Sequence, residues 1–225
     1  QMLLQFPSLL HPLRPRPRFR RNTFSKELRR LEMFYGRAGY GGADAWLDSV
    51  VTLGEGRAVR LRVRVREGPR TLIREVRFYP QPVFSLDELR RVAPFKSGDA
   101  YPFNDALLGR GTRALRLAFL SRGYLAVSVQ DSTFLTPDSS AARLEYRMDP
   151  GPQFTIRALT IAGNIRTHAG LIGRELRFAV GEVYSYTRVE ESQQNLYNTS
   201  LFRNVSIREE HLDLRTSKLR RILVA

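Results

Sequence analysis

Hydrophobic and polar residues follow two different rhythms along this chain. Between residues 58 and 66 the sequence reads AVRLRVRVR, so apolar side chains alternate with arginines, as in a strand with one buried face. Between about residues 103 and 122 apolar side chains recur every three or four residues, which predicts a helix. Both patterns occur repeatedly, so the sequence predicts an α+β fold.

The most complete series of elements lies between residues 71 and 148. Strands are predicted at 71–79, 125–134 and 142–148, and helices at 86–92 and from about 103 to 122. Ser85 and Glu88 have the Ser-x-x-Glu spacing of a capping box, which marks the start of the first helix. Gly123 follows the second helix, where a left-handed C-terminal cap is expected. The predicted order is β-α-α-β-β, which gives a three-stranded mixed sheet with two helices on one face.

The segments on either side repeat parts of this order. Before it, we predict a helix at 25–35 and strands at 45–52 and 58–66, with no convincing first strand. After it, we predict a strand at 154–161, helices beginning near residues 167 and 187, and strands at 205–209 and 219–224.

Two short marks recur at nearly the same spacing. Gly68-Pro69 returns as Gly151-Pro152 after 83 residues (151 − 68), and Gly39-Tyr40 returns as Gly123-Tyr124 after 84 (123 − 39). A degraded third copy ends in Leu201-Phe202. Two independent marks with one period indicate a tandem array of a small module. We therefore expect an N-terminally incomplete module at 1–67, a complete one at 68–149, and one at 150–225 with a truncated C-terminal strand.

The composition narrows the kinds of function. The chain has no cysteine, which excludes disulfides, thiolate metal sites and cysteine nucleophiles. Its histidines, His11, His168 and His211, lack metal-ligand spacing, and no paired-carboxylate or nucleophile-elbow pattern occurs. We therefore expect no enzyme activity, no metal and no cofactor. An array of such modules presents surfaces to other proteins, so the function is expected along its edges and faces.

The chain is strongly basic, with 37 Lys and Arg against 22 Asp and Glu and a net charge of +15. Nucleic acid, anionic lipid and acidic proteins are all candidate partners for such a charge. The arginines are spread over nearly every predicted element, which is typical of a general surface residue. A ladder of four lies on one face of the strand at 58–66: Arg60, Arg62, Arg64 and Arg66.

This basic face has three interpretations. A solvated outer sheet face is favoured, because the aromatic residues needed to stack on bases fall mostly on predicted buried faces. A contact with an acidic partner or anionic membrane lipid is a second hypothesis. Nucleic-acid binding is not expected; a steep salt dependence of duplex binding would support it.

The ordered series of motifs resembles a known family. A β-α-α-β-β module with Gly-Pro before its first strand and Gly-Tyr after its second helix is similar to a POTRA (polypeptide-transport-associated) domain. The last module adds four further marks, which resemble the barrel-proximal domain of the outer-membrane assembly family (BamA- and TamA-like proteins): Ile161-Ala-Gly-Asn164 with Thr167, Arg174-Glu-Leu176, Gly181-Glu-Val-Tyr184, and Leu201-Phe202 with Val205. The resemblance covers about residues 24–225.

This resemblance implies a location and partners. POTRA arrays of that family lie in the periplasm before a C-terminal β-barrel in the outer membrane. They bind accessory lipoproteins and nascent outer-membrane proteins, partly by β-augmentation at the edge of the second strand. Carried onto this chain, that edge is at 45–51, 125–132 and 205–208, with the partner-binding residues Trp46, Val50, Leu125, Val127, Val129, Val205 and Ile207. The alternative is a scaffold that binds one folded partner, as in cell division or secretion, and handles no substrate.

Overall fold

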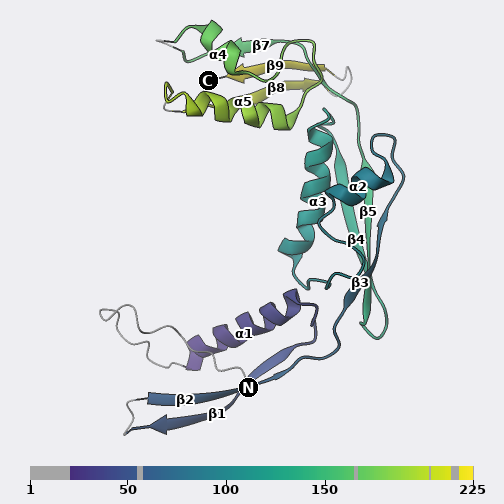
Figure 1. Ribbon diagram of the computed structural model, residues 1–225, viewed down its shortest axis with the longest axis vertical. Coiled ribbons are helices and arrows are strands. Elements are labelled where there is room, and N and C mark those ends of the chain that lie inside the picture. The colour runs from purple at the N-terminus through teal and green to yellow at the C-terminus, as the bar shows by residue number, and fades with distance from the viewer. Residues whose placement is uncertain (1–20, 55–57, 165–166, 203, 214–217, 225) are drawn as a thin grey trace.

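The computed structural model describes residues 21–54, 58–164, 167–202, 204–213 and 218–224. These residues form three units that follow one another in an arc, with the longer helices α1, α3 and α5 on its inner side and the sheets on its outer side (Figure 1). We call them the first unit (residues 21–66), the middle unit (72–149) and the third unit (154–224). None of the helices among the described residues is long and apolar enough to cross a membrane.

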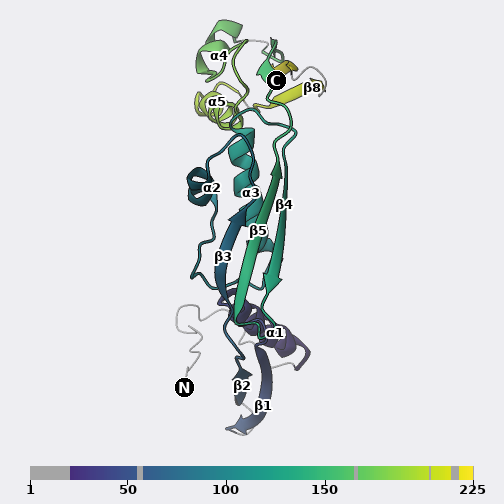
Figure 2. The ribbon, with the colours of Figure 1, turned by 90° about the vertical axis from the view of Figure 1, so that its right-hand side faces the viewer.

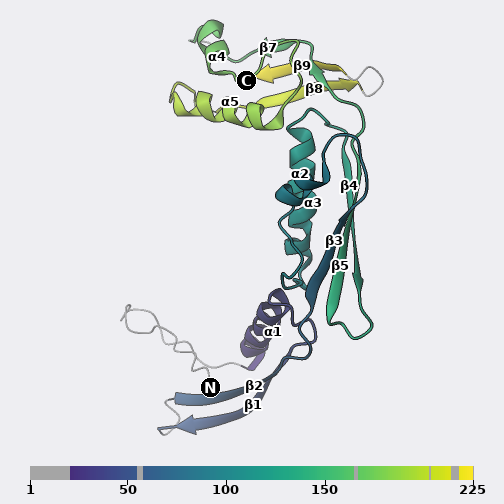
Figure 3. The same cartoon turned by 45° about the vertical axis from the view of Figure 1, so that its right-hand side comes forward.

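The middle unit has the predicted order of elements. It contains β3 (Leu72–Phe78), α2 (Leu86–Val92), α3 (Asp105–Leu120), β4 (Ser128–Leu135) and β5 (Ala141–Asp149). The sheet order is β3-β5-β4, in which β3 runs parallel and β4 antiparallel to β5. Both helices lie on one face of this sheet (Figure 3), and the predicted capping box of Ser85 and Glu88 is present. The predicted α+β fold class is confirmed.

The core of the middle unit lies between α3 and β5. Leu115 and Phe119 of α3 and Ile73 of β3 are fully buried, and Tyr146 of β5 is 1% exposed. Burying a large apolar side chain contributes about 1.5–3 kcal/mol, so these few residues account for much of what holds the helix on the sheet.

The start of β4 differs from the prediction. β4 begins at Ser128 rather than at residue 125, so Leu125 and Val127 lie outside the strand. The Val127 N–H donates to Tyr124 O (3.4 Å) in a turn, and the Val127 side chain is buried in the middle core. Leu125 packs against the core of the third unit. The alternation of apolar residues at 125 and 127 predicted a strand, but these two side chains lie in a turn and pack against the cores of two different units.

The third unit repeats the order with a divided first strand. The predicted strand at 154–161 is split into β6 (Thr155–Ile156) and β7 (Leu159–Ile161), which both run parallel to β9 (Lys218–Val224). Helices α4 (Ala169–Glu175) and α5 (Tyr186–Asn198) follow, and β8 (Ile207–Asp213) pairs antiparallel with β9. Val205, predicted to lie in this second strand, precedes β8 and is buried.

The first unit is smaller within the described residues. It consists of α1 (Arg21–Arg37) and an antiparallel pair of β1 (Asp44–Leu53) and β2 (Ala58–Arg66), which has a bulge at Asp48. Strand β2 occupies the predicted range, with arginines on one face. Among the described residues before Gly68, Ala45 is the only buried hydrophobic side chain. The remainder of the module expected at 1–67 lies outside the described residues.

The repeated Gly-Tyr pairs form the joints between units. The Thr71 N–H donates to Gly39 O (2.8 Å), and the Phe154 N–H donates to Gly123 O with the same length. The same two donors also accept a hydrogen bond through their carbonyls. Thr71 O accepts from the Tyr101 N–H, and Phe154 O accepts from the Tyr184 N–H (both 3.0 Å), and each tyrosine lies thirty positions further along the chain. The two joints are therefore copies of one backbone arrangement.

Close approach explains why glycine occupies both turns. Gly39 and Gly123 have φ of 98° and 85°, in the left-handed region that side chains disfavour. A Cβ at Gly39 would lie 2.8 Å from Thr71 O, and one at Gly123 would lie 3.0 Å from Tyr184 O. Arg122, the residue before Gly123, is held on the middle unit, because it donates to Glu88 Oε1 (2.6 Å) and to Val83 O (3.0 Å). Hydrogen bonds from Arg122 and Ser85 lower the pKa of Glu88 to about 2.

The joint geometry predicts the effect of adding a methyl group. In Gly123→Ala the Cβ meets Val183, Tyr184 and Phe154, so we expect the Phe154 amide to exchange its hydrogen about tenfold faster or more. Gly98→Ala is the control, because Gly98 has a similar φ of 94° but nothing within 4 Å of the added Cβ. If the Phe154 amide exchanged at the same rate in both variants, the close backbone contact at Gly123 would not be what stabilises the hydrogen bond between the two units.

A second glycine pair predicts opposite effects within one helix. A Cβ at Gly111 of α3 would collide with the buried Tyr146 hydroxyl, whereas one at Gly109 meets only the flexible Arg113 guanidinium, at 3.1 Å. Gly111→Ala should lower the free energy of unfolding by about 1–3 kcal/mol through overpacking. Gly109→Ala should raise it by up to about 1 kcal/mol through helix propensity. Hydrogen exchange of the β5 amides measures both, and effects of the same sign would contradict this account.

Candidate functional site

Strand β4 presents a free edge along the middle sheet. The Thr136 N–H donates to Ala141 O (2.9 Å), which identifies a hydrogen-bonded pair at the end of the hairpin. From there the pairing with β5 runs to Ser128–Asp149 without a register shift. Hydrogen-bonded and non-bonded pairs alternate in an antiparallel ladder. Four residues therefore direct their backbone N–H and C=O groups away from the sheet: Val129, Asp131, Thr133 and Leu135.

Few features protect this edge. Natural proteins block edge strands with lysine, proline, bulges or inward-pointing charges. The sequence of β4, SVQDSTFL, contains no basic residue and no proline, and its ladder has no bulge. Its single charge, Asp131, accepts a hydrogen bond from Thr112 of α3 (2.9 Å), so the carboxylate is held against its own helix. Burial, with a smaller contribution from Asp131, raises the pKa of the neighbouring Tyr146 to about 12.

The residues predicted to bind partners lie in different settings. Val129 is on the β4 edge, whereas Leu125, Val127 and Val205 precede their strands, as described above. Ile207 begins β8, which is also an edge because it pairs with β9 alone. Trp46 and Val50 of β1 are 40% and 38% exposed. Asp131 falls within the edge expected at 125–132, whereas the sequence analysis missed Thr133 and Leu135, whose backbones the hairpin register also directs outward.

The arginine ladder on β2 is largely neutralised by the strand beside it. Arg64 Nε lies 3.0 Å from Asp48 Oδ1, Arg62 lies 4.0 Å from the same carboxylate, and Arg66 lies 3.2 Å from Asp44. These are exposed pairs, which contribute about 0–1 kcal/mol each. The ladder is thus a paired, solvated sheet face, and Arg60 is its one member with no ion pair among the described residues.

The charged side chains on the outer face of the middle sheet also pair with one another. Glu145 of β5 is only 8% exposed and accepts a hydrogen bond from the Tyr79 hydroxyl (2.9 Å). Arg143 Nε lies 2.8 Å and Arg77 3.7 Å from the other oxygen of this carboxylate. Because the charges of this face pair with one another, the edges are the better binding candidates.

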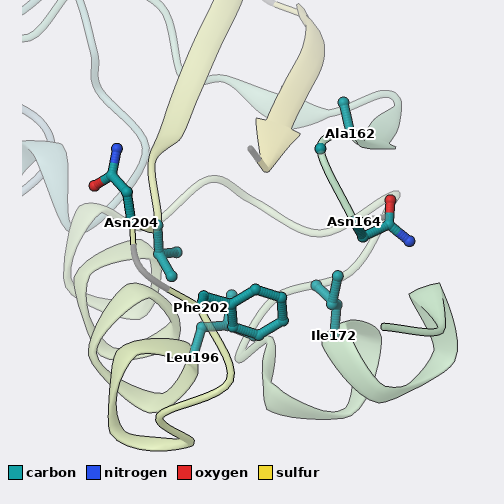
Figure 4. Close-up of a pocket in the computed structure, with 8 residues that line it drawn as sticks. Ala162, Asn164, Ile172, Leu196, Phe202 and Asn204 are labelled. Carbon is teal, nitrogen blue, oxygen red and sulfur yellow. The ribbon is translucent and has the colours of Figure 1, made fainter. Parts of the chain in front are cut away.

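The small pocket of the third unit does not indicate a small-molecule site. In the third unit a pocket of about 50 Å³ lies between α4, α5 and the segment before β8. Ile172, Leu196 and Phe202 converge in it, while the amides of Asn164 and Asn204 lie at its rim (Figure 4). Ligand sites usually measure about 300–1,000 Å³, so this one is too small. Within the described ranges no group of His, Asp or Glu has the arrangement of a metal site.

Comparisons with known proteins agree with this architecture. The family model described as "POTRA: Surface antigen variable number repeat" matches residues 154–222. The outer membrane protein assembly factor BamA of Neorickettsia risticii (strain Illinois) is 25% identical over 192 residues, which are 84% of this chain and 25% of that protein. The chain therefore spans about a quarter of the length of this relative.

Solved structures show the same fold. BamA POTRA3-5 of Haemophilus influenzae superposes with a TM-score of 0.60 at 20% identity, covering 89% of this chain and 78% of that one. BamA of Haemophilus ducreyi lacking POTRA domains 1-3 gives a TM-score of 0.57 at 19% identity, covering 68% of this chain and 28% of that one. The resemblance found in the sequence is confirmed: residues 154–222 match the POTRA family model, and the chain has the fold of the POTRA arrays of BamA proteins.

Proposed function

We propose that this chain is the periplasmic POTRA region of an outer-membrane protein assembly factor, and that β4 receives substrate polypeptides as an added strand. The uninterrupted edge of β4 carries this proposal. Its four outward-facing residues offer main-chain donors and acceptors over the length of the strand. Main-chain pairing gives affinity with little dependence on side chains, which suits a receptor for many unfolded substrates.

The similarity to a BamA assembly factor supports the biological setting. In this proposal the modules are 1–67, 68–149 and 150–225, and β8 of the last module offers a second edge of the same kind. Accessory lipoproteins and a β-barrel following this region are the further partners. Binding of one folded protein without substrate handling is the competing function.

A proline in β4 tests the edge directly. Thr133→Pro removes one outward N–H and leaves the ladder to β5 intact, whereas Thr133→Ala keeps that N–H and serves as the control. An extended peptide from an outer-membrane barrel strand should bind about tenfold more weakly to the proline variant than to the alanine variant, because the ring also displaces the incoming strand. NMR titration of the full chain should locate the wild-type shifts at Val129, Asp131, Thr133 and Leu135.

Other outcomes lead elsewhere. Equal binding to both Thr133 variants, with the β5 amides still protected, would move the receptor away from β4. No binding of any barrel peptide would favour the scaffold for a folded partner. A proline at Val127 would not serve, because that residue is part of the core.

A further inference from the structure

A groove runs along the opposite edge of the middle sheet. Figure 2 shows β3 at the edge away from β4, with α2 beside it. The groove between them measures about 840 Å³. Its lining comes from β3, α2 and the loop at residues 95–97. No motif in the sequence marked this surface, because its residues come from three separate segments.

Part of the β3 edge is already occupied and part is free. The Ile73 N–H donates to Asp99 O and the Gly98 N–H donates to Ile73 O (both 2.8 Å), while Ser97 Oγ donates to Arg74 O (2.7 Å). Further along, the Tyr79 N–H donates to Tyr146 O (2.9 Å), so Tyr79 bonds to β5. Successive residues of a strand direct their backbone groups to opposite sides. The N–H and C=O groups of Val76 and Phe78 therefore point into the groove.

The side chains give this short edge a chemical preference. Val76, Phe78 and Phe95 form an apolar floor, and all three belong to or pack against the middle core. Both acids of the lining are neutralised, Glu75 by Arg77 and Asp87 by Arg90 (3.2 Å each). Three exposed cations remain without a carboxylate partner among the described residues: Arg74, Arg91 and Lys96.

We propose that this groove binds a second extended polypeptide, one that carries acidic side chains and pairs with Val76 and Phe78. Unpaired cations that line a groove beside a strand edge match a chain whose backbone bonds to β3 while its carboxylates reach Arg74, Arg91 and Lys96. A lipid headgroup needs the cations but has no use for the strand edge or the long apolar floor. The site differs from β4, which has no basic residue and selects for backbone alone.

Two matched peptides test the charge preference. Both are acetylated and amidated and about eight residues long; Glu alternates with Val in one, and Gln replaces Glu in the other. The Glu peptide should bind more tightly, shift the amides of Val76 and Phe78, and lose affinity as salt rises. The double variant Arg91→Gln with Lys96→Gln should weaken the Glu peptide about fivefold and leave the Gln peptide unchanged.

The control lowers the same charge elsewhere on the unit. Arg110→Gln with Arg116→Gln changes two exposed arginines of α3 and should leave both peptides unaffected. Thr133→Pro should also leave the Glu peptide unaffected, which separates this site from the receptor proposed on β4. The proposal fails if the two peptides bind alike or not at all, or if their shifts fall on β4. It also fails if only phosphatidylglycerol vesicles respond to the Arg91 and Lys96 substitutions.

Discussion

The hydrogen bond from the residue just before the first strand of one unit to a glycine carbonyl of the unit before it fixes the arrangement of the whole chain. Thr71 and Phe154 are 1% and 0% exposed, so their backbone N–H groups have no access to water. Leaving such a group without an acceptor costs about 1–3 kcal/mol, which makes the joint an obligatory contact. Gly39 and Gly123 supply the acceptor, and only a residue without a Cβ allows the required approach.

This joint also decides which edges of the middle unit stay open. The start of β3 is committed to the joint and to the loop at residues 96–99, so its free edge is short. β5 is central and pairs on both sides. β4 takes part in no joint and has an unbroken ladder on one side only. A long edge without basic residues and a short edge flanked by unpaired cations thus follow from how the array is assembled.

Local patterns in the sequence predicted the helices and strands correctly where the side chains of a segment pack within a single unit. The alternation at 58–66 gave β2, and the Ser85–Glu88 spacing gave the start of α2. The prediction failed where neighbouring residues pack in different units, as Val127 packs in the middle core and Leu125 against the core of the third unit. It also failed where one predicted strand is divided into two, β6 and β7. The groove at β3 could not be foreseen either, because ion pairing decides which of its charges are free. Arg90 and Arg91 are adjacent in sequence, but only Arg90 has a carboxylate partner within the described part of the chain.

The third unit breaks the pattern at the position of the joint. Ser200 follows α5 where Gly123 follows α3, and its φ of 57° places a residue with a Cβ in the same left-handed turn. A neighbour that approached Ser200 as Thr71 approaches Gly39 would collide with this Cβ. Tyr197 and Leu201 beside it are 61% and 56% exposed, whereas their counterparts Leu120 and Tyr124 pack on the middle core. A protein surface that covers these two side chains must therefore do so by apolar packing at a larger backbone distance, and not through another copy of the glycine joint.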